Sequence, residues 1–219
     1  MHLFLRLGFG VALLSTVALA QNYYVNSHGQ QAPADAYQVR YAANLAAGDS
    51  VVNLTNAGTK GGYDSNGDIC ANVYVFADDQ QLIACCACPL TPNHLQHLSV
   101  NGDLVSNTLT PGKPADVTIA LVATEQHGTC DPANLNGIQD ADGRGFDVDF
   151  AEGLRAWGTT LHAAPGGGYT VSETEFSQAS LSDSELDKMV SYCGFIKADG
   201  SGYGICNSCT LGAAGAAKQ

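Results

Sequence analysis

Basic residues are scarce in this chain. Nine lysine and arginine residues stand against 21 aspartate and glutamate residues, which gives a formal net charge of −12 at pH 7. Proteins that bind nucleic acid or anionic membranes need clustered lysine and arginine. The composition therefore argues against nucleic acid as a partner, while it leaves many carboxylates available for hard cations.

Long hydrophobic runs are missing beyond the first twenty residues, which argues against membrane insertion. Residues 1–20 contain Arg6, a short apolar stretch over 7–17 and a small-x-small sequence at Ala18 to Ala20. This is the pattern of a secretory signal peptide, and cleavage after Ala20 would make Gln21 the first mature residue. We therefore predict a secreted or extracellular protein, with the periplasm as an alternative location.

The cysteines all follow this N-terminal segment, and their number is even. In an exported chain this pattern favours disulfides, although four bridges can connect in about 105 ways. A thiolate site for zinc or copper is the alternative, but an oxidising compartment disfavours it. We expect the cysteine of the C-terminal helix to pair with one of the last two cysteines, and Cys130 to anchor a long loop. The eight are Cys70, Cys85, Cys86, Cys88, Cys130, Cys193, Cys206 and Cys209.

Alternating apolar and polar residues predict β-strands along most of the chain. The central feature is a hairpin over 70–93 with its turn at 77–80. Both faces of its strands are apolar, which is typical of the middle of a sandwich. Asn101-Gly102 predicts a tight turn after another strand. The strands are predicted near 37–45, 51–55, 94–100, 117–122, 154–163 and 169–176.

One helix is predicted around 183–198. Ser182 and Glu185 form a capping box, and apolar residues follow at helical spacing from Leu186 to Ile196. We predict a mainly β fold, an antiparallel β-sandwich with one short C-terminal α-helix, held by disulfides. The predicted organisation is a signal peptide (1–20), a flexible N-terminal arm (21–35), a single β-rich domain (36–209) and a flexible tail (210–219).

Three segments carry a resemblance: ICANVYVF followed by CCACPLTPN, GLRAW at 153–157, and YCGFIKADGSGYGIC at 192–206. With these motifs the chain resembles an uncharacterised family of secreted bacterial proteins. The resemblance covers about residues 51–209. It implies export and the placement of the cysteines, and it implies no activity or catalytic residue.

A calcium site is one candidate for chemistry. Asp140, Asp142, Asp147 and Asp149 lie close together around two glycines, as oxygen ligands do in calcium loops. Aligning Gly143 with the glycine of an EF-hand places Ile138 at the first ligand position, so that motif is broken. Ordinary solvated turns, which use the same residue types, are the alternative interpretation.

Catalytic patterns are weak. Glu173 and Glu175 share one strand face, whereas the carboxylates of glycosidases normally come from different elements across a cleft. His94 and His97 lack the glutamate and helix of a zinc protease, and no nucleophile elbow occurs. We therefore predict an exported, non-enzymatic β-sandwich that needs no cofactor and serves as a structural, surface or binding module. It would self-assemble or bind an unidentified extracellular ligand. The alternative is a calcium-binding or metal-dependent secreted enzyme.

Overall fold

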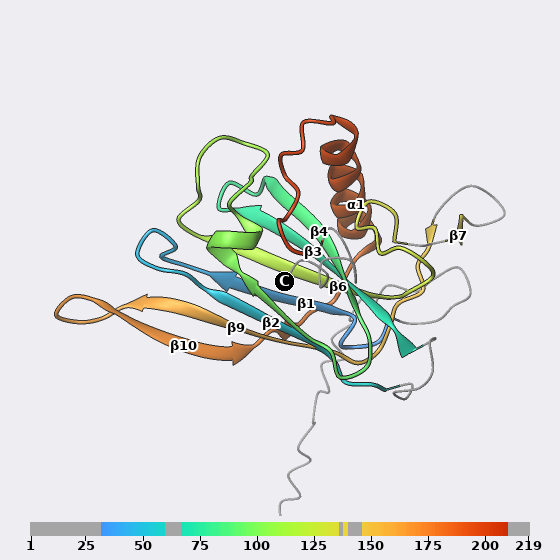
Figure 1. The fold of residues 1–219 in the computed structure, drawn as a ribbon, viewed down its shortest axis with the longest axis horizontal. Helices are drawn as coiled ribbons and strands as arrows, with labels where there is room; N and C mark the ends of the chain where they lie inside the picture. Colours follow the sequence, from blue (N-terminus) through green and yellow to red (C-terminus); the bar gives the residue numbers. More distant parts are fainter. Residues whose placement is uncertain (1–31, 60–66, 136–137, 140–145, 210–219) are drawn as a thin grey trace, which may run out of the picture.

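Two antiparallel β-sheets pack face to face, and one C-terminal helix covers the outer face of the larger sheet (Figure 1). The computed structural model describes residues 32–59, 67–135, 138–139 and 146–209. The predicted mainly β fold with one C-terminal helix and disulfides is confirmed. The predicted signal peptide and the predicted tail lie outside the described residues. Of the predicted arm, residues 32–35 are described.

The larger sheet has five strands and contains the predicted central hairpin. Strands β3 and β4 pair with the turn that the sequence predicts, and β6 pairs with the other side of β3. In spatial order the strands are β11 (Ser177–Gln178), β1 (Tyr37–Ala42), β6 (Val117–Glu125), β3 (Ile69–Ala77) and β4 (Leu82–Leu90).

The smaller sheet has four strands, and its β9–β10 hairpin projects beyond the body of the molecule (Figure 1). Strand β10 leads through Phe176 directly into β11, so the chain crosses here from the smaller sheet to the larger one. In spatial order the strands are β10 (Tyr169–Glu175), β9 (Leu154–Ala163), β2 (Val51–Asn56) and β5 (Leu95–Ser99). A short pair, β7 (Ile138–Gln139) and β8 (Phe146–Asp147), lies apart from both sheets.

The hydrophobic core has two parts, because side chains of the five-stranded sheet are buried on both faces. Val73 and Leu121 belong to the part between the sheets, together with Leu54 from the opposite sheet. Tyr74 and Val122 belong to the part beneath the helix. The apolar character of both faces of β3 and β4 is therefore explained by a sheet on one side and a helix on the other.

Helix α1 (Asp183–Ala198) begins where the capping box predicts. The Ser182 hydroxyl accepts a hydrogen bond from the Glu185 amide at 3.3 Å. Leu186, Met189 and Ile196 are buried against the sheet. An N-cap of this kind satisfies an otherwise unpaired amide, and the apolar stripe provides the packing face. Within the described residues, no helix is long and apolar enough to cross a membrane.

Three local expectations are wrong. Strand β4 is the last strand of its sheet rather than a middle one, and its apolar outer face is covered by α1. Asn101-Gly102 lies in a five-residue π-helical turn (Val100–Leu104) instead of a tight hairpin turn. The Asp49 and Asp103 carboxylates bind amides of Asn101 and Ser99 there, so side chains hold the wider turn.

The third wrong expectation concerns β1. In the sequence Tyr37, Val39 and Tyr41 alternate with polar residues, which predicts that these three side chains form the buried face of a half-buried strand. Tyr41 is, however, 57% exposed, while Gln38 is 4% exposed. Gln38 and Arg40 point toward strand β9 of the other sheet and bind its backbone or side chains. At this margin of the sandwich the inner face is therefore polar.

Candidate functional site

The disulfides form the covalent framework that the cysteine count predicts. They join Cys70 to Cys130, Cys85 to Cys193, Cys86 to Cys206 and Cys88 to Cys209, and no cysteine is free. The anchoring of a long loop by Cys130 is confirmed. Four bridges suit an oxidising, extracytoplasmic environment.

The expected partner of Cys193 is wrong. It pairs with Cys85 of β4, and not with Cys206 or Cys209. Successive side chains of a strand point to opposite faces, so Cys85 faces the helix while Cys86 and Cys88 face the other way. Cys85 therefore forms its disulfide with the helix, and Cys86 and Cys88 form theirs with the C-terminal segment.

The predicted calcium loop lies mostly outside the described residues. Asp140 and Asp142 are outside them, and of Asp147 only the backbone, in β8, is described. Asp149 is described, and its Oδ2 lies 3.1 Å from His127 Nε2. Among the side chains that the structure places, no group of three or more His, Cys, Asp or Glu could hold a metal ion. The calcium site therefore remains a prediction.

Glu173 and Glu175 lie on the same face of β10, as predicted, but their surroundings differ. Glu173 accepts a hydrogen bond from Asn53 Nδ2 at 3.2 Å, and Asn53 also contacts His97. Glu175 lies at the end of the strand and lines an open cleft. Of the two carboxylates, Glu175 alone lines this cleft.

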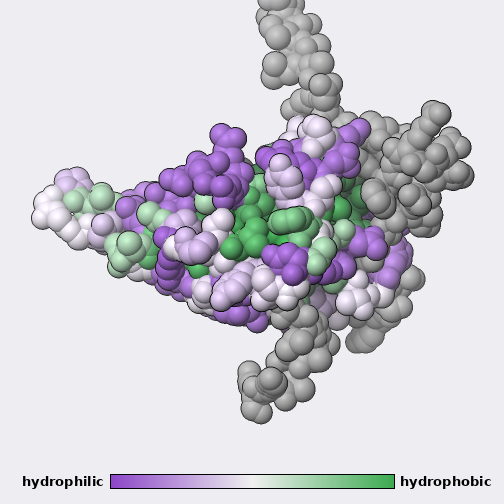
Figure 2. Space-filling model, turned by 90° about the horizontal axis from the view of Figure 1, so that it is seen from above, coloured by the Kyte–Doolittle hydropathy of each residue, from purple (hydrophilic) through white to green (hydrophobic). Residues whose placement is uncertain are grey.

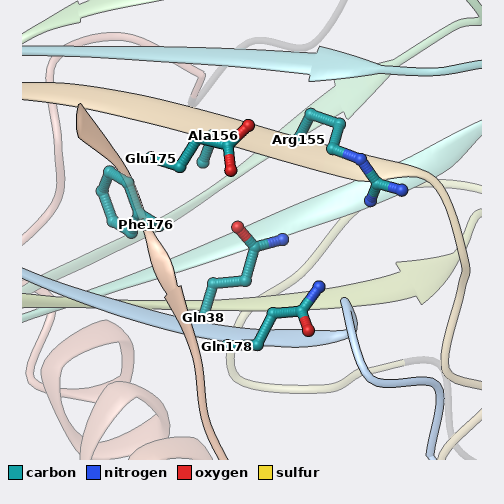
Figure 3. A pocket seen from close by; sticks show the side chains of 6 residues that line it. All are labelled: Gln38, Arg155, Ala156, Glu175, Phe176 and Gln178. Carbon is teal, nitrogen blue, oxygen red and sulfur yellow. The ribbon is translucent and has the colours of Figure 1, made fainter. Parts of the chain in front are cut away.

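The cleft lies where β10 passes into β11, at the margin between the two sheets. It has a volume of about 400 Å³, which is within the range of small-molecule sites. Figure 3 shows side chains from both sheets pointing into the space between them. The six lining residues are Gln38, Arg155, Ala156, Glu175, Phe176 and Gln178.

Gln38 is the fixed polar group of the cleft. Its Nε2 donates to the carbonyl of Asp35 at 2.8 Å and to the carbonyl of Leu154 at 3.0 Å. Both amide hydrogens are therefore used, and the side-chain oxygen is left to accept a hydrogen bond (Figure 3). Because the side chain is 4% exposed and bonded to two different segments, the orientation of this acceptor is fixed.

Arg155 supplies a positive charge at the mouth of the cleft. Its Nη1 bonds Asp35 Oδ2 at 2.5 Å and the carbonyl of Leu154 at 2.8 Å. A guanidinium carries five N–H donors, so this pairing holds the group while other donors still point outward. The side chain is 45% exposed, whereas that of Asp35 is 13% exposed. Asp35 thus acts as the fixed partner that positions the arginine.

A polar seam joins β1 and the residues that follow it to β9 beyond the cleft. Arg40 Nη2 donates to Thr160 Oγ1 at 2.9 Å, and Asn44 Nδ2 donates to the carbonyl of Leu161 at 2.8 Å. Burial lowers the pKa of Arg40. With Gln38, these contacts link the two sheets through polar side chains. The seam explains why the sandwich opens into a polar cleft at this margin.

Sequence reasoning missed Gln38, Arg155 and Gln178. The β1 alternation assigned Gln38 to solvent, and only the GLRAW segment singled out the neighbourhood of Arg155. The three residues lie far apart in the chain and meet only through the crossing from β10 to β11.

Comparison with known proteins gives no family for the chain. No family model matches it, and no curated protein matches it. A solved structure, "Crystal Structure of Thermotoga maritima 1070", has a TM-score of 0.35 and 9% identity. The match covers 66% of this chain and 97% of that one. This likeness is too distant to inform the site.

Proposed function

We propose that the chain is an exported, non-enzymatic binding module whose ligand site is the cleft between β1, β9 and β10. The observation that carries this proposal is the buried Gln38, whose amide nitrogen is fully used and whose oxygen faces the cleft. An oriented acceptor that faces an open cleft, with no donor bonded to it in the described residues, is a group to which a ligand can donate a hydrogen bond.

The charges around Gln38 suggest the class of ligand. Arg155 provides outward N–H donors for a carboxylate, and Glu175 provides an acceptor for an ammonium group. A small zwitterion, such as a free α-amino acid or the end of a short peptide, carries both groups. Its ammonium would lie between Glu175 and the Gln38 oxygen, and its carboxylate would face Arg155.

The lining residues support binding rather than catalysis. Glu175 is the one carboxylate among the six, so the pair of carboxylates used in glycoside hydrolysis is not provided by this cleft. The same six residues include no cysteine, serine or histidine that would serve as a nucleophile or general base. The four disulfides would keep such a module folded outside the cell.

Titration with amino acids tests the proposal. Trp157 is the only tryptophan of the chain and pairs in register with Glu175, so its fluorescence reports on this position. We expect a saturable change with zwitterionic amino acids or dipeptides, and a much weaker one with the corresponding amines or carboxylic acids alone. Calorimetry on the same ligands gives the affinity independently.

Variants separate the cleft from the rest of the sheet. Glu175→Gln removes the proposed ammonium partner and should weaken binding by about tenfold, since a hydrogen bond to a charged group contributes roughly 1.5–3 kcal/mol. Glu173→Gln changes the same charge on the same strand, away from the cleft, and should leave the affinity unchanged. Equal affinities of both variants and the unaltered protein, or no binding of any zwitterion, would contradict the proposal.

A further inference from the structure

The sheet edges of this protein are protected unequally. At β4 the C-terminal segment lies along the strand: the Cys85 amide donates to the carbonyl of Gly204 at 2.9 Å, and the Cys206 amide donates to the carbonyl of Cys85 at 3.4 Å. The Leu109 amide donates to the carbonyl of Ile83 at 2.9 Å. Two disulfides, from Cys86 and Cys88, hold the segment in place. This edge is closed.

The edge of β5 is short and partly capped. The Val100 amide bonds the carbonyl of Ser50 at 2.8 Å, so the odd-numbered residues of β5 direct their backbone groups away from β2. Among these groups, the Ser99 amide donates to Asp103 Oδ2 at 2.7 Å. The His97 carbonyl accepts from Gln96 Nε2 at 3.1 Å. Strand β11, at the other margin of the larger sheet, has only two residues.

Strand β10 differs from these edges because it is seven residues long and open. The Ala164 amide bonds the carbonyl of Gly168 at 3.0 Å, and the Phe176 amide bonds the carbonyl of Ala156 at 2.9 Å. Gly168 and Phe176, which flank the strand, both have even numbers. The backbone amides and carbonyls of the even-numbered residues Thr170, Ser172 and Thr174 therefore also point toward β9.

The odd-numbered residues of β10 therefore direct their amides and carbonyls outward. Within the described part of the chain these backbone groups have no hydrogen-bond partner. Figure 1 shows β10 at the margin of the molecule with no described element on its outer side, and Figure 2 shows the hairpin as a narrow projection. The residues are Tyr169, Val171, Glu173 and Glu175.

We propose that β10 pairs antiparallel with β10 of a second copy of this chain, which would join two four-stranded sheets into one of eight strands. Hydrogen bonds between the two copies form only where residues with outward-pointing backbone groups lie opposite one another, and this limits the register of the pairing. A two-fold axis at Ser172 places Tyr169 opposite Glu175 of the partner subunit, and Val171 opposite Glu173 of the partner subunit.

The side chains favour a second copy as the occupant. Tyr169 and Val171, which are 50% and 63% exposed, form the first half of the strand, and the two glutamates form the second half. Antiparallel self-pairing brings the apolar half of each copy to the acidic half of the other. No like charges then lie directly opposite, and the Tyr169 hydroxyl can donate to the facing carboxylate. An axis at Glu173 would place this residue opposite itself, so that register is disfavoured.

Sedimentation equilibrium of the full mature chain, from micromolar to millimolar concentration, tests the inference. We expect a reversible dimer. Val171→Pro removes an outward amide and keeps every bond to β9, so it should weaken association by about tenfold or more, because two symmetric hydrogen bonds are lost. Val171→Ala keeps the amide, and His97→Pro alters the β5 edge instead. Both should remain dimeric.

Hydrogen exchange of the unaltered protein provides a second test that needs no variant. The amides of Tyr169, Val171, Glu173 and Glu175 should exchange more slowly in the concentrated sample than in the dilute one, while amides at the β5 edge should not change. A monomer at millimolar concentration, a Val171→Pro variant that dimerises like the unaltered chain, or unchanged exchange at the four amides would overturn the proposal.

Discussion

Single polar side chains hold the ends of the strands together, and Asn56 is the clearest case. It is 1% exposed, and its Nδ2 donates to the carbonyls of Gly67 at 2.8 Å and Leu90 at 2.9 Å. Its Oδ1 accepts from the Gly58 amide at 2.8 Å. One side chain thus satisfies three backbone groups from three segments, as buried polar groups require.

Replacing Asn56 by alanine should destabilise the fold strongly. The change leaves an amide and two carbonyls without this partner, and each unsatisfied buried group costs about 1–3 kcal/mol. We expect a loss of roughly 2–5 kcal/mol in the free energy of unfolding, measured by denaturant titration. Asn53→Ala, on the same strand but at its exposed face, should cost less than about 1 kcal/mol. Equal losses of stability in the two variants would show that the buried hydrogen bonds of Asn56 do not stabilise the fold more than an exposed side chain does.

Tyr74 is a buried group that links stability to pH. It is fully buried, and its hydroxyl donates to the carbonyl of Pro132 at 2.7 Å. Burial first, and then the negative charge of Asp131, raise the pKa of Tyr74. The protonated form is therefore favoured in the folded state. Its contribution is complete below the unfolded pKa of about 10 and is lost as pH rises toward the folded pKa.

We expect the free energy of unfolding to fall above about pH 10, because unfolded tyrosine releases its proton there. The slope attributable to Tyr74 approaches about 1.4 kcal/mol per pH unit. Tyr74→Phe should be less stable by about 1–2 kcal/mol at neutral pH, and its curve should be flatter at alkaline pH. Tyr37, whose pKa is also raised by burial, contributes to both proteins. If the free energy of unfolding of Tyr74→Phe and of the unaltered protein fell equally with rising pH, Tyr74 would not be the source of this pH dependence.

At the scale of elements, β4 and α1 are joined by a single bridge. Cys85 and Cys193 are both fully buried and lie 108 residues apart in sequence. Closing a long loop restricts the unfolded chain, and the bridge also fixes the helix on the sheet. The helix packs mainly through Leu186, Met189 and Ile196, so the apolar contact remains if the bridge is removed.

Replacing Cys85 and Cys193 together by alanine should lower the free energy of unfolding by about 2–5 kcal/mol. Amides of α1 should then exchange faster, while those of the central strands β3 and β6 keep their protection relative to global unfolding. Replacing Cys70 and Cys130 together is the matched control, because it removes a bridge that does not involve the helix. Equal exchange of α1 in both variants would argue against the proposed role of the bridge.

Many of the strands and the helix can be predicted from the sequence. The hairpin is predictable because its two apolar strands flank a polar turn, and the helix because Ser182, Glu185 and the apolar spacing agree. The pairing of Cys193 was not predictable, because it depends on which face of β4 the helix covers. The cleft was not predictable either, since Gln38 and Arg155 meet only through the order of strands in the two sheets.

At the scale of the whole molecule, the C-terminal segment has a clear structural role. It closes the edge of β4 with backbone hydrogen bonds and two disulfides, and thereby prevents that edge from pairing with another chain. Strand β10 is left as the long open edge among the described strands. Under the proposed pairing, the disulfides of β4 therefore leave β10 as the strand at which two copies associate.

The disulfide map of the unreduced protein is the most direct test of the covalent framework. Stepwise reduction and alkylation, followed by mass spectrometry, resolves bridges that begin at the neighbouring positions 85, 86 and 88. We expect the bridges Cys70–Cys130, Cys85–Cys193, Cys86–Cys206 and Cys88–Cys209, with no free thiol. A bridge from Cys193 to Cys206 or Cys209, or free thiols at β4, would contradict it.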